Sequence, residues 1–264
     1  MTCELPFIVT IAILGAMGGF AAGLLGFGGG VVMFPLLFYV PPLLGFEKLD
    51  PKAVAALVVS QVFFSTLIGG AAHWRSGRVH LTLTLAAGLS SAAGAFMGGI
   101  GSKWVSESFL FLLFGVVTLL VGAMMLLPAP PSHREEVPVE MVTVPTLPLS
   151  IVSVVIGAII GFLGAGNFVF VPLLIYVLKV PTRISIGSSL FIAMLNTFSG
   201  FLGKLLTWQI PLLMALVIIP AGIAGALAGE SLHRRLSPQV LRHIYAAMVA
   251  VITVRIWITL LVGD

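Results

Sequence analysis

Two glycine-rich segments carry the most evident chemistry of this sequence. Segments 23–37 and 161–174 each contain several glycines ahead of a Pro-Leu-Leu triplet. Glycine runs interrupt a helix and let the backbone adopt positive φ, and in lipid such backbone is tolerated only where it is buried or lines a cavity. A helix that restarts after the run directs its first N–H groups and positive dipole end into that cavity. Such a helix start is an anion site in outline. The candidate residues here are Gly28, Gly29, Gly30, Val31, Gly166, Asn167 and Phe168.

The apolar segment after each glycine run contains uncharged polar side chains that could donate hydrogen bonds to an oxyanion. Gln61 and Ser65 are four residues apart, and Ser189 and Asn196 seven, so each pair shares one helix face. A single serine is explained as well by bonding to its own helix or to a neighbouring one, whereas a side-chain amide is costly to leave unpaired in apolar surroundings. The candidates are Ser60, Gln61, Ser188, Ser189 and Asn196.

Charge is rare within the apolar segments, and Arg255 is its clearest instance. An ionisable residue inside a bilayer marks a functional site by default, which makes Arg255 a candidate counter-charge for an anion. A long side chain near a segment end can instead snorkel to the interface. His73, Lys204 and Glu230 stand at segment ends, and we assign them to the membrane interface.

The sequence lacks the residue patterns of several other functions. The five histidines have no ligand spacing and Cys3 is the single cysteine, so we predict no metal, cofactor or disulfide. The apolar segments hold no nucleophile–base or carboxylate pair for a hydrolase, and the basic residues are scattered rather than clustered for nucleic acid. We therefore expect neither an enzyme nor a nucleic-acid partner.

The elements that position these residues are membrane helices. Of 264 residues 59% are hydrophobic and 8% charged, whereas a soluble domain carries about 25% charged residues. The apolar runs are continuous and lack the alternation of a transmembrane barrel, which predicts an all-α bundle. We predict ten helices: 5–25, 31–40, 53–71, 81–100, 109–127, 149–163, 168–178, 184–203, 211–229 and 244–261.

The two halves of the chain resemble each other. Glycines recur 138 residues apart at Gly19 and Gly157, and 131 residues apart at Gly94 and Gly225, in the same order throughout. The Gly-x-x-x-Gly pairs at 94–98 and 225–229 are typical of close helix packing, which is also the alternative explanation of the glycine-rich segments. We predict a first repeat at 1–127, a Pro- and Glu-rich linker at 128–148 and a second repeat at 149–264.

Length predicts how each half crosses the membrane. Segment 5–40 would be about 54 Å long as one helix, too long for a single crossing, so the chain turns back at the glycines as full passes or a re-entrant hairpin. Each half then makes an odd number of crossings, and the repeats are inverted. Seven Lys and Arg fall on one side and four on the other, which favours cytoplasmic placement of the linker and periplasmic termini. A parallel arrangement with one broken span per half gives the same ratio.

The duplicated glycine motif, the polar second helices and the Gly-x-x-x-Gly helices together resemble the sulfite exporter family of TauE/SafE type, the toluene sulfonate uptake permeases, over essentially the whole chain. Residues that match the first motif are Gly26, Gly28, Gly29, Gly30 and Pro35. In the second copy Gly164 and Gly166 match, whereas Asn167-Phe168 stands where glycine is usual. The resemblance implies a bacterial inner-membrane transporter of small anions, often sulfite, sulfonates, sulfoacetate or organic acids.

Together these patterns predict a multi-pass transporter that moves a small sulfur-containing anion by alternating access. A coupling ion, H⁺ or Na⁺, and the oligomeric state stay open. The alternatives are a non-transporting membrane scaffold or assembly subunit, and an anion channel.

Overall fold

A computed structural model of the chain describes residues 5–25, 28–75, 79–125, 144–233 and 235–262, which form helices and no strand. The α-helices are α1 (Leu5–Leu25), α2 (Gly30–Leu43), α3 (Pro51–Arg75), α4 (Leu81–Gly101), α5 (Glu107–Met125), α6 (Thr146–Leu163), α7 (Phe170–Pro172), α8 (Thr182–Leu206), α9 (Leu212–His233) and α10 (Pro238–Val262). Two irregular turns flank α7: the 3₁₀ turn η3 (Asn167–Val169) and the π turn η4 (Leu173–Val177).

The helices have the dimensions of membrane spans. Within the described ranges seven are long and apolar enough to cross a bilayer, and three shorter apolar helices cover Gly30–Leu43, Pro51–Leu67 and Asn167–Val177. The all-α, multi-pass architecture is thereby confirmed. Many large apolar side chains remain exposed on the outer faces, as expected for lipid contact.

The predicted linker lies mostly outside the described residues, because 126–143 are not described. Helix α6 begins at Thr146, three residues before the predicted start at Leu149. Pro148 falls in its first turn, where the missing N–H has no partner to lose.

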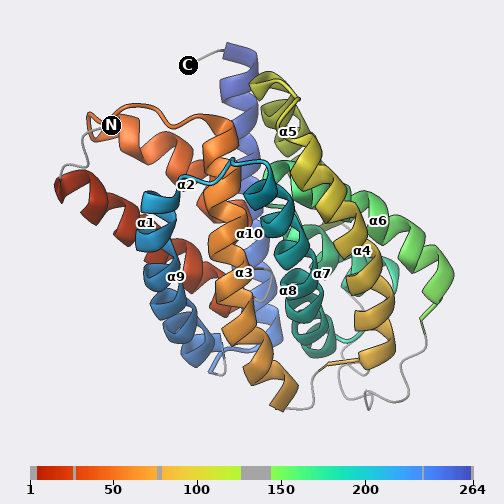
Figure 1. Cartoon of the computed structure of the whole chain (residues 1–264). Helices are drawn as coiled ribbons and strands as arrows, with labels where there is room; N and C mark the ends of the chain where they lie inside the picture. The colour runs from red at the N-terminus through yellow and green to blue at the C-terminus, as the bar shows by residue number, and fades with distance from the viewer. Residues whose placement is uncertain (1–4, 26–27, 76–78, 126–143, 234, 263–264) are drawn as a thin grey trace.

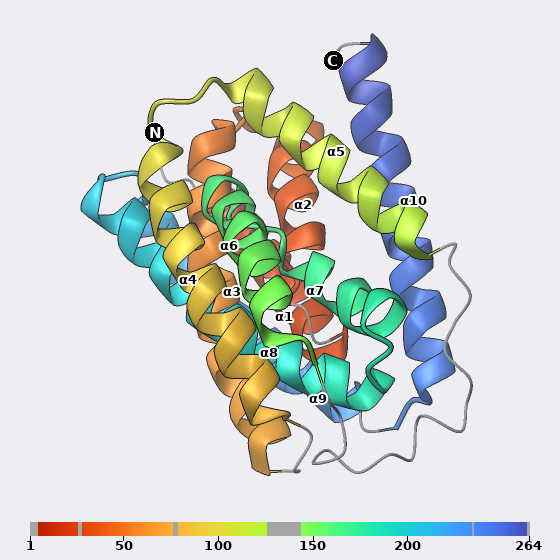
Figure 2. The same ribbon diagram turned by 90° about the vertical axis from the view of Figure 1, so that its right-hand side faces the viewer.

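The helices of the two halves interleave. Helices α3 and α8 lie side by side at the centre, with α1 and α9 on one side and α4 and α6 on the other (Figure 1). Helix α1 of the first half therefore packs on α9 of the second, and α6 of the second on α4 of the first. Helices α5 and α10 pack on each other along one flank (Figure 2).

Glycines bring the backbones of α1 and α9, and those of α4 and α6, into direct contact. A Cβ added at Gly19 would lie 1.9 Å from the carbonyl oxygen of Gly222, and one at Gly157 would lie 2.0 Å from that of Ser91. These two contacts occupy equivalent repeat positions, since Gly19 and Gly157 are 138 residues apart and Ser91 and Gly222 are 131 apart.

The Gly-x-x-x-Gly pairs make the reciprocal contacts. Added Cβ atoms at Gly94 and Gly225 would each lie 2.0 Å from a carbonyl oxygen, of Val154 and Ala16 respectively. The predicted packing role of these glycines is confirmed.

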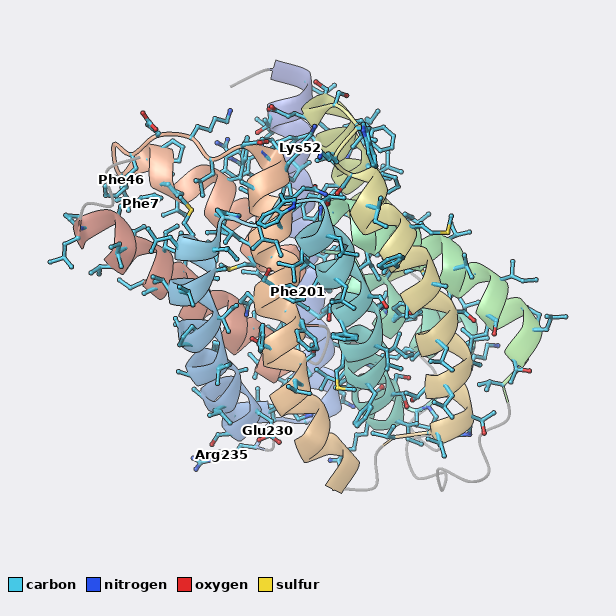
Figure 3. The ribbon with its side chains drawn as sticks, viewed as in Figure 1. Phe7, Phe46, Lys52, Phe201, Glu230 and Arg235 are labelled. Carbon is cyan, nitrogen blue, oxygen red and sulfur yellow. The ribbon has the colours of Figure 1, made fainter. Side chains whose placement is uncertain are left out.

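The central helices run in opposite directions. Lys52, in the first turn of α3, donates from Nζ to the carbonyl of Lys103, just beyond α4. At the same end, Lys204 in the last turn of α8 donates to Ser102. Figure 3 places Lys52 at one end of the bundle and Glu230 at the other. The start of α3 thus lies beside the end of α8, although the two helices occupy equivalent repeat positions.

Candidate anion site and its two vestibules

The first glycine segment separates α1 from α2. Gly28 and Gly29 have φ of 81° and 71°, in the left-handed region that favours glycine. A Cβ at Gly29 would lie 2.1 Å from the carbonyl oxygen of Gly18, and one at Gly28 would lie 2.5 Å from the Val62 side chain of α3. Both glycines are therefore required by conformation and by space, apart from any role in binding.

The second glycine segment separates α6 from the turns that follow. Gly164 has φ of 66°, and a Cβ there would lie 1.9 Å from the carbonyl oxygen of Ala55. The predicted helix 168–178 is irregular: a 3₁₀ turn over Asn167–Val169, a single α turn and the π turn Leu173–Val177. In this respect it differs from α2, which is a continuous α-helix.

The two segments meet inside the bundle. A Cβ at Gly30 would lie 3.1 Å from Cα of Ala165 and 3.3 Å from the Val58 side chain of α3. The Phe114 ring of α5 contacts both segments. It stacks on the Phe34 ring, with 4.7 Å between ring centroids, and lies edge-on to the Phe168 ring at 6.3 Å. The structure thus brings the candidate residues of both halves together beside α3.

The predicted amides form two buried polar clusters at equivalent helix pairs. Gln61 on α3 donates from Nε2 to Ser65 Oγ at 2.9 Å and lies against Gly222 of α9. Asn196 on α8 donates from Nδ2 to Ser91 Oγ of α4 at 3.4 Å. The side-chain carbonyl oxygen of each amide is buried and has no hydrogen-bond partner within the described ranges.

Asn167 is the most exceptional of the predicted residues. It is 2% exposed and begins the second segment's 3₁₀ turn. Neither its Oδ1 nor its Nδ2 has a hydrogen-bond partner among the residues that the structure describes. A buried amide without partners costs about 1–3 kcal/mol, so this side chain is poised for a ligand or water.

The predicted serines are bonded to the protein. Ser60 donates to the Ala56 carbonyl at 2.7 Å, and Ser189 to the Ile186 carbonyl at 2.9 Å. Ser188 accepts a hydrogen bond from the His80 N–H at 3.0 Å, which ties the start of α8 to the start of α4. Their observed bonds are those of helix packing.

Arg255 has the exposed position of the snorkelling alternative, whereas Lys204 is more buried than predicted. Arg255 is exposed, with its guanidinium 4.7 Å from the Tyr39 ring centroid, in an outer groove of about 470 Å³ between α2 and α10. It does not join the buried amides. Lys204, predicted at the interface, is fully buried, and its Nζ donates to Ser102 Oγ at 2.7 Å and to the Phe162 carbonyl at 3.4 Å. The side chain of His73 lies outside the described set.

A wide and a narrow cavity lie near opposite ends of the bundle, and we call them the open and the closed vestibule; none of the candidate residues 28–31 and 166–168 lines either one. The open vestibule, between α2, α3, α5 and α10, has a volume of about 640 Å³ and is lined by Lys48, Asp50, Pro51, Glu107, Ser108 and Phe111 among others. The closed vestibule has a volume of about 10 Å³ and is lined by residues that include Ile175, Tyr176, Thr182, Ile186, Arg242 and Tyr245.

The two vestibules are built from equivalent positions. Three pairs of lining residues, 137 or 131 positions apart, correspond in the repeat: Phe38 and Ile175, Pro51 and Thr182, Phe111 and Arg242. The cavity is thus wide at one end of the bundle and narrow at the corresponding end.

Two residues of the closed vestibule were missed in the sequence. The Tyr245 hydroxyl donates to the Phe168 carbonyl and so ties α10 to the second glycine segment. Arg242 Nη1 is buried, and no described residue accepts a hydrogen bond from it. The sequence predicts the last helix from Ile244 whereas it begins at Pro238, so Arg242 falls outside the predicted helices. No group of three metal-ligating residues occurs in the described ranges.

The fold defines a class of protein: a helical membrane protein with two interleaved halves and glycine-lined interior segments. The family model for sulfite exporter TauE/SafE matches residues 11–256, and the chain belongs to this family. No solved structure matches the chain.

Curated relatives carry transporter names. The chain is 33% identical over 241 residues to a "Probable membrane transporter protein" of Xylella fastidiosa (strain Temecula1), covering 87% of this chain and 86% of that one. It is 22% identical over 245 residues to the "Probable membrane transporter protein YunE" of Bacillus subtilis, covering 86% and 89%. A relative in Haemophilus influenzae with the first of these names is 27% identical over 222 residues, covering 78% and 77%.

Proposed function

We propose that this protein transports a small anion, namely sulfite, a sulfonate or a related sulfur-containing organic acid, by alternating access, and that it is not an enzyme. The observation that carries the proposal is the pair of vestibules at equivalent positions, one of about 640 Å³ and one of about 10 Å³. Alternating access requires two entrances to one site, of which only one is open at a time.

Inverted repeats supply the second state. The antiparallel course of α3 and α8, together with the matched glycine contacts, supports two halves of opposite orientation. If the halves exchange their conformations, the closed vestibule opens and the open one shuts. We place the repeats at 1–127 and 149–264 and the linker between them.

The substrate site in this proposal is the meeting point of the two glycine segments. Its backbone donors belong to Gly28–Val31 and Gly166–Phe168, and its side-chain donors to Asn167, Gln61 and Asn196. Amide oxygen and nitrogen positions exchange on a flip, so Gln61 can turn its N–H₂ toward an anion while its oxygen accepts from Ser65. All three side-chain donors are uncharged, which suits a weakly bound anion that must leave again.

Transport is tested with purified protein in liposomes. Uptake of labelled sulfite, sulfoacetate, taurine and acetate is expected to saturate with concentration for at least one sulfur-containing anion. A non-transporting scaffold predicts no uptake by folded protein, and a channel predicts flux that does not saturate. Imposed H⁺ or Na⁺ gradients in the same vesicles identify a coupling ion.

Location and orientation complete the proposal. We place the protein in the bacterial inner membrane as a multi-pass protein, with periplasmic termini and a cytoplasmic linker, on the bias of Lys and Arg. An impermeant thiol reagent applied to intact cells is expected to label Cys3 and to spare a cysteine introduced at Ser132.

A further inference from the structure

The two ends of the bundle differ in charge at equivalent positions. Segment 47–52, at the open vestibule, carries Glu47, Lys48, Asp50 and Lys52, and Glu107 follows nearby. The equivalent segment 178–183 carries Lys179 and Arg183 and no acidic residue. A rim of this kind attracts anions, although exposed basic residues alone also follow from membrane orientation.

Arg242 is not explained by orientation alone. Its Nη1 is buried beside the closed vestibule and has no hydrogen-bond acceptor in the described part of the chain, whereas its repeat equivalent at the open vestibule is Phe111. A buried guanidinium nitrogen without an acceptor is costly. The adjoining space of about 10 Å³ holds at most one water molecule.

The side chains around Arg242 are suited to bind an oxyanion. A guanidinium offers N–H groups in a planar fork that fits two oxygens of a sulfite, sulfonate or carboxylate group. Thr182 and Tyr245 line the same cavity, and the Tyr245 hydroxyl is held by the Phe168 carbonyl while the vestibule is shut. Opening would release that hydroxyl beside Arg242.

We propose that Arg242 is the oxyanion-recognition residue of the vestibule that is closed here, with Tyr245 and Thr182 as its hydroxyl partners. This inference rests on the proposed anion transport. It assigns to Arg242 the counter-charge role that the sequence suggested for Arg255, and it makes the end that carries Lys179 the end with higher anion affinity.

The test compares two arginines of one helix. Sulfite transport in liposomes and sulfite binding in detergent are measured for wild type, Arg242→Lys, Arg242→Met and the matched control Arg255→Met. We expect Arg242→Met to raise KM and Kd by about tenfold or more, Arg242→Lys to raise them less, and Arg255→Met to leave them unchanged.

The outcomes separate the inference from the function. Wild-type protein that moves no anion contradicts the proposed transport itself. Wild-type transport with unchanged KM in both Arg242 variants overturns only the role of Arg242. Failure of both variants to fold, seen as aggregation in size-exclusion chromatography, would make Arg242 a folding residue and also overturns the inference.

Discussion

Replacing Tyr245 with Phe removes one hydroxyl from the seal of the closed vestibule. Tyr245 is 3% exposed, and its hydroxyl donates to the carbonyl of Phe168, a fully buried residue. The equivalent position in the first half is Phe114, so this place in the fold accepts a phenyl ring. The substitution is therefore expected to leave the fold intact while weakening one conformation.

The size of the effect follows from the hydrogen bond. A buried bond of this kind contributes about 0.5–1.5 kcal/mol net, and in the opened vestibule water replaces it. Removing the hydroxyl therefore shifts the balance toward opening by about two- to tenfold. The first half cannot form the same bond because Phe114 has no hydroxyl, which favours the state observed here, in which the vestibule beside Arg242 is the narrow one.

Cysteine reactivity measures the shift. In a Cys3→Ser background, single cysteines replace Thr182, which lines the closed vestibule, or Ser108, which lines the open one. Tyr245→Phe is expected to raise the maleimide labelling rate at position 182 by about two- to tenfold, without an increase at position 108.

A matched control makes the same chemical change elsewhere. Tyr39 donates from its hydroxyl to Thr259 Oγ1 at 2.8 Å, between α2 and α10, where Thr259 lines the open vestibule and not the closed one. Tyr39→Phe is expected to leave labelling at position 182 unchanged. An unchanged rate in Tyr245→Phe, or an equal rise in Tyr39→Phe, would refute the assignment of Tyr245 as the seal.

Two further predictions concern glycine packing and the buried amide. Gly164→Ala is expected to destabilise the fold by about 3 kcal/mol or more, because its φ is 66° and its Cβ would meet the Ala55 carbonyl; thermal unfolding in detergent measures this. Gly122→Ala, with no atom within 4 Å of the added Cβ, is expected to be neutral or stabilising, and equal losses in both variants would contradict the packing argument. Asn167→Leu is expected to raise Tm, because it removes a buried amide without partners, and to raise KM for sulfite by about tenfold; a lower Tm with unchanged KM would show that the amide serves the fold and not the anion.

Much of the fold could be predicted from the sequence because it depends on local, strong signals. The first helix is predicted at Leu5–Leu25 and observed there, since a continuous apolar run ends at glycine. The interruption before α2 follows likewise from Gly28 and Gly29, whose positive φ no other residue adopts as cheaply. Nine of the predicted helices have a single helical counterpart among the described residues, whereas 168–178 is broken into 3₁₀, α and π turns. Several helix ends differ from the prediction by a few residues, and α10 begins six residues earlier, at Pro238.

The arrangement of the site could not be predicted, because it depends on partners far away in sequence. Lys204 donates hydrogen bonds to Ser102 and to the Phe162 carbonyl, which are 102 and 42 residues away. The hydropathy pattern predicts only that Lys204 lies at the end of a helix. The role proposed for Arg242 depends on the Tyr245–Phe168 contact and on the cavity beside it, and no local sequence pattern predicts either.

The contacts between helices differ in a way that bears on movement. Helices α1 and α9, and equally α6 and α4, meet through glycines at backbone distance, an interlocked geometry that resists sliding. Helices α3 and α8 meet through side chains: the Phe63 ring lies 5.3 Å from Phe198 and 5.9 Å from Phe201, and a Cβ added at Gly200 would lie 3.3 Å from the Val59 side chain. Rings can repack by changing rotamer, whereas glycine contacts at the backbone cannot. We therefore expect alternating access to move α1 with α9, and α6 with α4, each as one unit, and to change the ring packing between α3 and α8. Arg242 would be exposed as the opposite vestibule shuts.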